Sequence, residues 1–266
     1  MHAFSYHKPS TLGDALSLAA KKSDGKILAG GQSLVQAMKL RLASPSDLID
    51  LSGIKELTGI KADGSSVTIG AMTRHAEVEA NADVKKMIPA LARLAGGIGD
   101  RQVRHMGTIG GSLANSDPAA CYPAAVLGLG ATIVTNKRKI AADDFFKGLF
   151  ETALETGELI TAVTFPAPKR AGYIKFKNPA SRFALVGVFV ADTGSGIRVA
   201  VTGAASCVFR ATAIEKALAA KFEPDAVPAG TVKADTLNSD LHGSAEYRAH
   251  LITVMAKRAV AQALGK

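Results

Sequence analysis

The chain has 266 residues, of which 47% are hydrophobic and 21% are charged. This composition is typical of a globular protein with a sizeable core, and the length favours two or three structural units. The two cysteines, Cys121 and Cys207, have no CxxC spacing, so the chain cannot house an iron–sulfur cluster, which needs about four thiolates. Because glycine or charge interrupts every apolar stretch, we expect no transmembrane segment and a cytoplasmic protein.

The formal net charge of +9 could favour binding to nucleic acid, to an acidic protein surface or to an anionic cofactor. The cations are spread along the chain, and their longest cluster is Lys137, Arg138 and Lys139. Aromatic residues make up 5% of the chain and tryptophan is absent, so platforms for stacking nucleobases are not expected. A solvated cationic surface is therefore favoured over a nucleic-acid site.

The N-terminal half predicts alternating helices and strands. Apolar spacing predicts a helix within residues 9–22, with Thr11 and Asp14 as a capping box. A strand over 26–29, the loop Gly30-Gly31-Gln32-Ser33 and a helix over 34–42 come next. Later segments predict strands at 47–51 and 66–69, and helices at 74–80 and 87–96.

A second glycine-rich loop over residues 107–112 precedes a predicted helix at 119–127 and a strand at 130–135. The composition changes near Pro166 and Pro168. The pattern beyond them predicts strands at 173–176, 185–191 and 197–202, then helices at 215–220 and 247–264. We therefore expect a C-terminal antiparallel sheet with helices on one face.

Both glycine loops could bind phosphate. Gly30 and Gly31 allow backbone N–H groups to approach a ligand closely, and Ser33 can bind phosphate or cap the next helix. By itself such a loop is more often a structural turn. The loop Thr108–Ser112 offers a second set of backbone and hydroxyl donors, which favours one cofactor clamped between the two loops. Neither loop matches the signatures of ordinary NAD or ATP sites.

The two loops lie in a pattern that resembles the FAD-binding medium subunits of the molybdenum hydroxylases, the xanthine dehydrogenase and carbon monoxide dehydrogenase flavoprotein family. The pattern comprises AGGQSL at 29–34, MKLR at 38–41, QVR at 102–104 and GTIGGS at 107–112. Supporting similarity continues through GELI at 157–160 and YIK at 173–175 to EYR at 246–248. The resemblance covers essentially the whole chain.

The resemblance implies an α+β fold with two FAD-binding subdomains of the vanillyl-alcohol-oxidase type, followed by a C-terminal α+β domain. We expect FAD-binding subdomain 1 at residues 1–58, FAD-binding subdomain 2 at 59–168 and the C-terminal flavoprotein domain at 169–266. FAD would lie extended between the subdomains.

The same resemblance implies that the first loop wraps the pyrophosphate and that the second contacts FAD from the opposite side. Ile98 and Ile160 would pack near the flavin or adenine, and Asn115 and Asp117 would reach the ribityl or ribose. Lys175 would lie near the isoalloxazine carbonyls, where a cation stabilises negative charge on the reduced ring. We expect no catalytic or metal-binding residue, and the expected FAD-binding set is Leu28, Ala29, Gly30, Gly31, Gln32, Ser33, Leu34, Ile98, Thr108, Ile109, Gly111, Ser112, Asn115, Asp117, Ile160, Tyr173 and Lys175.

One position departs from the family. Cys121 stands where relatives often have an aspartate that bonds the cofactor, and a thiol is a poor acceptor. Asp117 could take over, a water could fill the gap, or FAD could bind less tightly. As a side chain, Cys121 is expected to be small and buried in a helix rather than reactive.

Several other residues keep two interpretations. Tyr173 either stacks on the flavin or belongs to the core of its strand. Arg101 and Arg104 either attract phosphate or an acidic partner, or lie exposed on a turn. His75 and His105 have no metal-ligand spacing and are expected to be structural or peripheral.

The resemblance implies the FAD-binding electron-transfer subunit of a heterotrimeric molybdenum hydroxylase, an oxidoreductase. Electrons would arrive from [2Fe–2S] clusters of a small partner subunit and leave FAD for an external acceptor. A large molybdopterin subunit would oxidise the substrate. The alternatives are an autonomous flavin-dependent reductase or oxidase, and a basic binding module without flavin.

Overall fold

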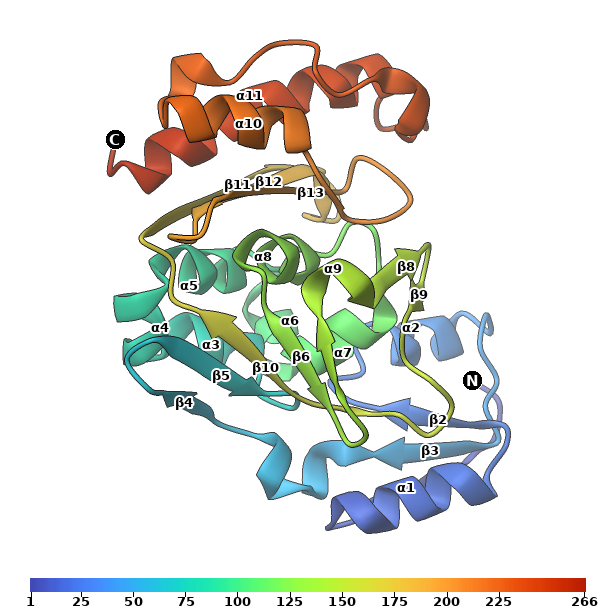
Figure 1. The fold of residues 1–266 in the computed structure, drawn as a ribbon. Helices are drawn as coiled ribbons and strands as arrows, with labels where there is room; N and C mark the ends of the chain where they lie inside the picture. The colour runs from blue at the N-terminus through green and yellow to red at the C-terminus, as the bar shows by residue number, and fades with distance from the viewer.

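The computed structural model describes residues 1–266, and the chain folds into mixed helices and sheets (Figure 1). The first sheet is parallel, with the strand order β1 (Ser5–His7), β3 (Asp47–Asp50) and β2 (Gly25–Leu28). Two helices make the crossovers that parallel strands need: α1 (Leu12–Lys21) and α2 (Leu34–Lys39). They lie on opposite sides of this sheet (Figure 1). One half of the predicted capping box of α1 is present, because the Thr11 hydroxyl accepts the Asp14 N–H at 3.1 Å. The Asp14 carboxylate accepts from the Thr11 hydroxyl at 2.7 Å instead of from the Thr11 N–H.

The middle sheet is antiparallel, and its central strand is the last of its five strands in the sequence. Two short 3₁₀ turns, Leu51–Gly53 and Lys55–Leu57, lead into it. Its order is β4 (Ile60–Ala62), β5 (Ser66–Gly70), β10 (Ile160–Pro166), β6 (Thr132–Thr135) and β7 (Lys139–Ala141). One face buries alternate side chains such as Val67 and Val163. On the other face, Thr68 and Thr164 share a hydrogen bond of 2.9 Å.

A helical layer fills the segment between β5 and β6. It consists of α3 (His75–Ala80), α4 (Ala82–Met87), α5 (Pro89–Gly96), α6 (Arg101–Met106), α7 (Ile109–Asn115) and α8 (Tyr122–Leu129). The prediction of a glycine loop over 107–112 is wrong in one respect, because residues from Ile109 onward form α7. Thr108 begins that helix by accepting the Gly111 N–H on its hydroxyl at 3.2 Å.

A small appendage follows β7 at the front of the molecule in Figure 1. It consists of the short helix α9 (Ala142–Phe145) and the hairpin of β8 (Phe146–Gly148) and β9 (Glu151–Thr152). The tip of this hairpin exposes Leu149 and Phe150. The chain then returns to the middle sheet as β10.

The C-terminal part is an antiparallel sheet with two helices on one face (Figure 1). Its strands are β11 (Arg170–Lys177), β12 (Ala184–Asp192), β13 (Ile197–Thr202) and β14 (Phe209–Arg210), and its helices are α10 (Thr212–Ala220) and α11 (Ala245–Ala263). Two 3₁₀ turns, Pro224–Ala226 and Ala234–Thr236, connect the helices. The predicted sheet with helices on one face is confirmed.

The strand β12 is buried on both faces. Val188 and Val190 belong to the core shared with α10 and α11, whereas Phe189 and Ala191 belong to the core shared with the helical layer below. This explains why residues 185–191 form an unbroken apolar run instead of an alternating one.

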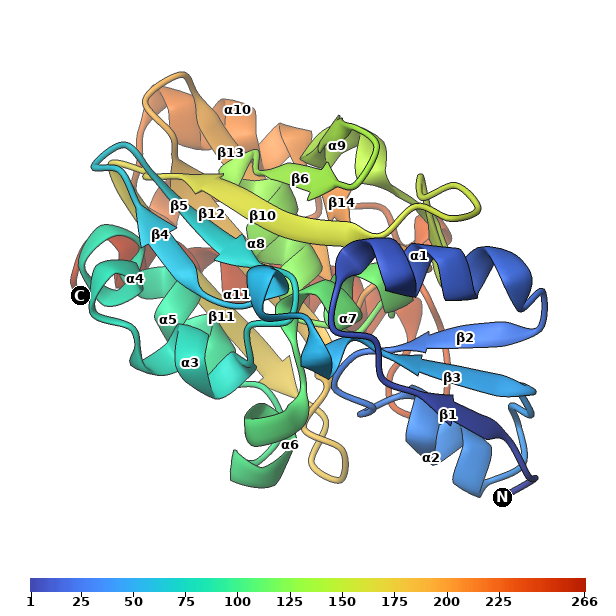
Figure 2. The same cartoon turned by 90° about the horizontal axis from the view of Figure 1, so that it is seen from below.

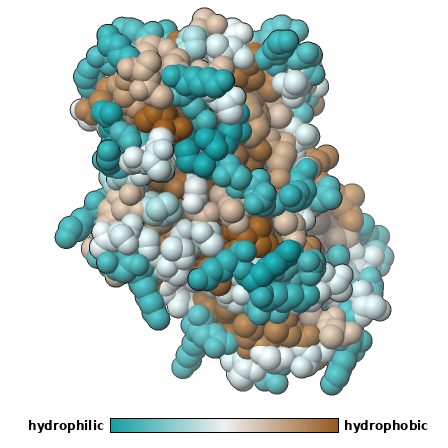
Figure 3. All heavy atoms as spheres, in the orientation of Figure 1, coloured by the Kyte–Doolittle hydropathy of each residue, from teal (hydrophilic) through white to brown (hydrophobic).

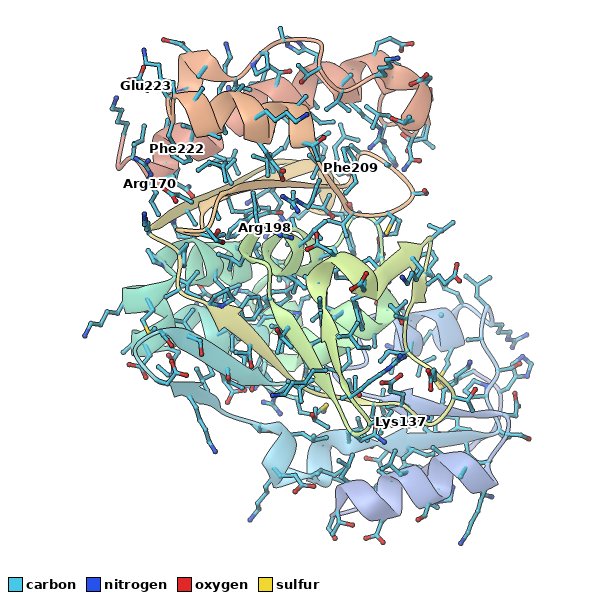
Figure 4. All side chains as sticks on the ribbon, in the orientation of Figure 1. Lys137, Arg170, Arg198, Phe209, Phe222 and Glu223 are labelled. Carbon is cyan, nitrogen blue, oxygen red and sulfur yellow. The ribbon has the colours of Figure 1, made fainter.

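Ion pairs fasten the C-terminal sheet to the layer beneath it. Arg198 of β13, visible between the sheet and α8 in Figure 4, donates from Nε to the Leu127 carbonyl at 2.9 Å. Its terminal nitrogen donates to both carboxylate oxygens of Asp143 at 2.8 Å. On the far side of the sheet, the Arg170 guanidinium lies 4.0 Å from the centre of the Phe222 ring (Figure 4).

The surface seen in Figure 3 is hydrophilic around its outline, with hydrophobic residues showing as patches between. No helix combines the length and the apolar character needed to cross a membrane. The three main sheets take their strands from residues 5–50, 60–166 and 170–210, which supports the proposed boundaries after residues 58 and 168.

Candidate functional site

A cavity of about 710 Å³ opens where the three parts of the chain meet. This volume lies within the roughly 300–1,000 Å³ of small-molecule and cofactor sites. Its wall includes the loop after β2, the α6–α7 region, the start of β10 and, from the C-terminal sheet, Lys175 and residues 181–183. The site is therefore assembled from segments that are far apart in sequence.

The first glycine segment makes an unusually close backbone contact. A Cβ atom on Gly30 would lie 2.3 Å from the Met106 carbonyl oxygen and 2.6 Å from the Gly107 Cα, so a larger residue does not fit. Gly31 has a φ of +72°, which favours glycine. The sequence thus carries two glycines because one must pack against α6 and the next must turn the chain.

That turn leaves hydrogen-bond donors facing the cavity. The backbone N–H groups of Gly31, Gln32 and Ser33 donate to no group of the protein, and all three residues line the cavity. The Ser33 hydroxyl does not cap α2, so it too is free for a ligand. Converging backbone N–H groups form a cradle for an anion such as a phosphate.

The second glycine segment has fewer free backbone donors than the first. Three of its N–H groups bond within the protein: Ile109 donates to the Thr73 carbonyl at 3.1 Å, Gly110 to the Ala71 carbonyl at 2.8 Å and Gly111 to the Thr108 hydroxyl at 3.2 Å. The Thr108 N–H donates to no group of the protein, and Thr108 lines the cavity. The Ser112 hydroxyl and the Asn115 amide line the cavity as well.

The two glycine segments meet at the back of the site. A Cβ atom on Gly111 would lie 3.1 Å from the Ala29 Cβ. Gly111 therefore allows α7 to approach the first loop, and a ligand between Ser33 and Ser112 would be in reach of both segments.

The cavity wall contains every residue of the expected FAD-binding set except Ile109 and Tyr173. The Ile109 side chain is fully buried in the core, because the helical turn of α7 directs it inward. Tyr173 is also buried, and its ring packs 6.1 Å from that of Phe189. Of its two interpretations, the structure shows the strand core. Burial raises the pKa of the Tyr173 hydroxyl, which stays protonated.

Lys175 extends from β11 into the cavity and contacts Cys121, the residue at which this chain departs from the family. Its Nζ lies 3.2 Å from the Cys121 Sγ and donates to the Arg182 carbonyl at 3.0 Å. Cys121 is buried, as expected, but it precedes α8 as the N-cap residue instead of lying inside the helix. Asp117 uses one carboxylate oxygen to accept the Ala119 N–H at 2.8 Å, and its other oxygen makes no hydrogen bond within the protein.

His75 is a buried part of the cavity wall. Its ring packs 5.2 Å from that of Tyr122, and its Nδ1 has no hydrogen-bond partner. Burial, and next the charge of Arg104, lower the pKa of His75 to about 4. The imidazole is therefore neutral at pH 7, and no feature of the sequence distinguished it from a peripheral histidine.

Arg104 supports the cavity wall but does not itself line the cavity. Its Nε donates to Glu79 at 2.9 Å, and a terminal nitrogen donates to the Ile98 carbonyl at 3.1 Å. This holds the turn that brings Ile98 into the cavity. Arg101 is exposed at the start of α6, which the sequence prediction had treated as a turn.

A buried carboxylate fixes the wall opposite α7. Glu158 accepts hydrogen bonds from Arg138 at 3.0 Å, from the Thr135 hydroxyl at 2.7 Å and from the Glu155 N–H at 2.9 Å. Arg138 is the main reason that the pKa of Glu158 falls to about 2. Lys137, labelled in Figure 4, donates to the Thr156 carbonyl at 3.0 Å and holds the same turn. These bonds position Ile160 in the wall.

Sequence reasoning missed part of the wall. Met72, Val103, Leu154, Leu159, Arg182 and Phe183 line the cavity, although none was expected there. They belong to turns and strand ends whose approach to the glycine segments is decided by tertiary packing. No local pattern marks such positions.

Comparison with known proteins identifies the family of the chain. Residues 2–168 match the FAD binding domain in molybdopterin dehydrogenase, and residues 171–263 match the CO dehydrogenase flavoprotein C-terminal domain. The chain belongs to the FAD-binding medium subunits of the molybdenum hydroxylases. FAD is the cofactor of this medium subunit, which is part of an oxidoreductase.

Several relatives are similar over nearly their full length. The nicotine 6-hydroxylase medium subunit of Paenarthrobacter nicotinovorans is 36% identical, covering 98% of this chain and 97% of that protein. The carbon monoxide dehydrogenase medium chain of Hydrogenophaga pseudoflava is 37% identical, covering 97% and 96%. A chain in the structure of reconstituted CO dehydrogenase from Oligotropha carboxidovorans matches with a TM-score of 0.92 at 34% identity, over 99% of this chain and 98% of that one. The expected α+β FAD-binding fold is confirmed.

The residues present fit FAD on their own chemistry. The unpaired N–H groups of Gly31–Ser33 suit a diphosphate, and the lining also offers apolar side chains for planar rings, such as Ile98 and Ile160. Lys175 supplies a positive charge at the C-terminal side of the cavity.

Proposed function

We propose that this medium subunit is the electron-transfer subunit of a heterotrimeric molybdenum hydroxylase. Electrons come from [2Fe–2S] clusters in a small subunit and leave for an external acceptor, while a large molybdopterin subunit oxidises the substrate. FAD suits this position because, when bound, it can exchange one electron or two. The observation that carries the proposal is the cavity with unpaired donors at Gly31, Gln32 and Ser33 in a chain of this family.

The chain's own residues divide the work of holding the cofactor. The backbone of residues 30–33 and the hydroxyls of Ser33 and Ser112 would bind the pyrophosphate. Asn115 and Asp117 would hold the ribityl or ribose hydroxyls, Asp117 through its free oxygen. Of the possibilities raised by Cys121, this favours Asp117 as the substitute acceptor.

Lys175 would orient and stabilise the flavin end. Its Nζ is held by the Cys121 Sγ and the Arg182 carbonyl, so the charge has a fixed position. A fixed cation near the flavin carbonyls favours the reduced, more negative ring. None of these contacts requires a catalytic residue in this chain.

The test is the cofactor content of the native complex, purified through an affinity tag on this subunit. FAD, iron, acid-labile sulfide and molybdenum should elute together, and the subunit released by a chaotrope should keep only FAD. Iron or molybdenum retained by the isolated subunit would contradict the proposal. Substrate turnover by the isolated chain would favour an autonomous flavin reductase or oxidase, and a chain that takes up no FAD would favour a basic binding module.

A further inference from the structure

Lys175 and Cys121 meet in the wall of the FAD cavity. Both residues line the cavity, and the Lys175 Nζ lies 3.2 Å from the Cys121 Sγ. No carboxylate lies within 4.0 Å of this Nζ, although the lysine is only partly exposed. Charged groups that are withdrawn from water are ordinarily paired with an opposite charge. Here a partly buried cation has a thiol as its side-chain neighbour.

The C-terminal sheet holds Cys121 in this place. The Gly203 N–H donates to the Pro118 carbonyl at 2.7 Å, and the Thr202 hydroxyl donates to the same carbonyl at 2.7 Å. Figure 2 shows β11 and β12 lying behind α5 and α8, on which they pack, and Cys121 is the N-cap residue of α8. The thiol therefore cannot move away from Lys175 without disturbing the contact between the two layers.

A second donor lies beside the same sulfur. The Tyr173 hydroxyl has no hydrogen-bond partner, and the residue is only 6% exposed. Burial, and next the neighbouring Cys121, raise the pKa of this hydroxyl, so it keeps its proton. A buried donor without an acceptor is costly, and a thiol sulfur is only a weak acceptor. An oxygen atom bound to the Cys121 Sγ would offer an acceptor to both Lys175 and Tyr173.

We propose that Cys121 is an oxidation site, where hydrogen peroxide converts the thiol into a sulfenic acid whose oxygen accepts hydrogen bonds from Lys175 and Tyr173. The O–O bond of the peroxide breaks and an S–O bond forms, so the sulfur is oxidised by two electrons and the peroxide is reduced. The thiol proton leaves with the second peroxide oxygen as water. An added thiol reverses the step by reducing the sulfenic acid.

The surroundings of Cys121 suit this reaction better than those of Cys207, the other cysteine of the chain. Reactive cysteines lie beside cations and within reach of small oxidants, and Cys121 combines the contact with Lys175 and a place in the cavity wall. Cys207 is more exposed, but burial raises the pKa of its thiol, which disfavours the reactive thiolate. The local sequence does not reveal the contact with Lys175, which is why Cys121 was expected to be unreactive.

The consequence for the flavin rests on the proposed function. An ionised sulfenic acid beside Lys175 would offset the positive charge that otherwise stabilises the reduced ring. The reduced flavin should then be about tenfold less favoured, which corresponds to a midpoint potential about 30 mV lower for a two-electron couple. Peroxide would thus make the flavin of this subunit a poorer electron acceptor.

The test uses the native complex, purified through a tag on this chain and treated with hydrogen peroxide. The complex is unfolded in urea with dimedone, which traps sulfenic acids, and the Cys121 and Cys207 peptides are compared by mass spectrometry. Cys121 should carry at least roughly tenfold more dimedone than Cys207, and dithiothreitol added before the dimedone should remove the difference. Because Cys207 is the more exposed thiol, equal labelling of the two would overturn the assignment.

Variants of the two donors test the geometry. Lys175→Met and Tyr173→Phe each remove one hydrogen-bond donor, and both should lower the labelling of Cys121 several-fold. Lys177→Met, on the same strand but outside the cavity wall, is the matched control and should be labelled like the wild type. Undiminished labelling in both donor variants would also overturn the assignment.

The flavin consequence has its own measurement. Cys121→Asp places a carboxylate beside Lys175 without any oxidant, and its flavin midpoint potential should match that of the peroxide-treated wild type. Cys121→Ser should not respond to peroxide. A labelled Cys121 with an unchanged potential would overturn the flavin consequence. The labelling requires no electron transfer between subunits, so a native complex without an iron–sulfur subunit would contradict the proposed function and leave the labelling result valid.

Discussion

Gly30 is the residue on which the approach of the two glycine segments depends. Gly30→Ala would place a Cβ against the Met106 carbonyl and the Gly107 Cα, and the loop that bears the unpaired N–H groups would have to move. We expect at least a roughly tenfold rise in the FAD dissociation constant, because misplaced donors lose charge-assisted hydrogen bonds. Flavin fluorescence quenching measures this constant.

The control is Gly13→Ala in α1, where a Cβ would meet nothing closer than 3.9 Å. That variant should bind FAD like the wild type, since alanine is also the better helix former. Equal FAD affinity in the two variants would show that Gly30 does not position the site.

Lys175 bears on the energy of the bound flavin. Removing its charge in Lys175→Met should make the reduced ring less favourable and lower the midpoint potential by about 30 mV, which is ~1.4 kcal/mol for a two-electron couple. A spectroscopic redox titration of the FAD-loaded subunit gives the value. Lys177→Met, on the same strand but outside the cavity wall, should leave the potential unchanged. A potential that does not differ between the two would remove Lys175 from the flavin environment.

Single residues show how far local reasoning reaches. Gly30 and Gly31 were expected at the site because a close backbone approach and a left-handed φ both require glycine, and a pair of glycines is visible in the sequence. Tyr173 was expected there too, but the packing of the C-terminal sheet on the helical layer buries its side chain in the core. Phe183 was not expected at the site, because only the pairing of β11 with β12 brings its loop to the cavity.

The turn 154–160 shows how one buried carboxylate fixes a whole element. Glu158 is ionised in the folded protein down to a pKa of about 2, whereas an unfolded glutamate has a pKa of about 4.3. Because the folded pKa is the lower one, this carboxylate stabilises the fold fully above pH ~4.3, and the stabilisation is lost as the pH falls towards 2.

Glu158→Gln should therefore weaken the dependence of unfolding free energy on pH in that acidic range. Urea unfolding at several pH values below neutrality measures the slope. Some slope should remain, because bonds from His7 and then Ser46 lower the pKa of Asp47 to about 2 as well. An unaltered slope would mean that Glu158 is not ionised in the fold at acidic pH.

Elements were predictable where their signals are local. The cap by Thr11 and the apolar spacing behind it define α1 within a residue or two of its observed bounds. Helix α7 was not predicted, because Gly110 and Gly111 have poor helix propensity. It forms nonetheless, since Thr108 caps it and Ala71 and Thr73 accept its first N–H groups.

At the scale of the whole molecule, Arg198 ties the C-terminal sheet to the layer that carries the cavity. Arg198→Ala should lower the free energy of unfolding by about 1–3 kcal/mol, because the Leu127 carbonyl and Asp143 both lose a charged donor. Denaturant unfolding measures the change. Lys221→Ala, which removes an exposed pair with Glu223, should have no measurable effect. Similar losses in both variants would argue against a special role for Arg198.

The overall organisation was predictable and the assembly of the site was not. The change of pattern near Pro166 and Pro168 indicates a separate sheet, and β11 to β13 follow it as expected. The sequence does not state that this sheet shares a core with α5 and α8, because the apolar run of β12 is compatible with any burial on both faces. The boundaries after residues 58 and 168 and a cytoplasmic location remain predictions.

The double burial of β12 has a consequence for how the subunit is made in the cell. The cavity takes Lys175 and Phe183 from the C-terminal sheet, and one face of that sheet is covered by α10 and by α11, which follows all of these residues in the chain. Until residues 245–263 have been synthesised, the valines of β12 have only α10 and the turn after it as cover on that face. The glycine loops are translated before these residues, so we expect the pocket to gain its last wall, and to capture FAD, only after residues 245–263 have been synthesised.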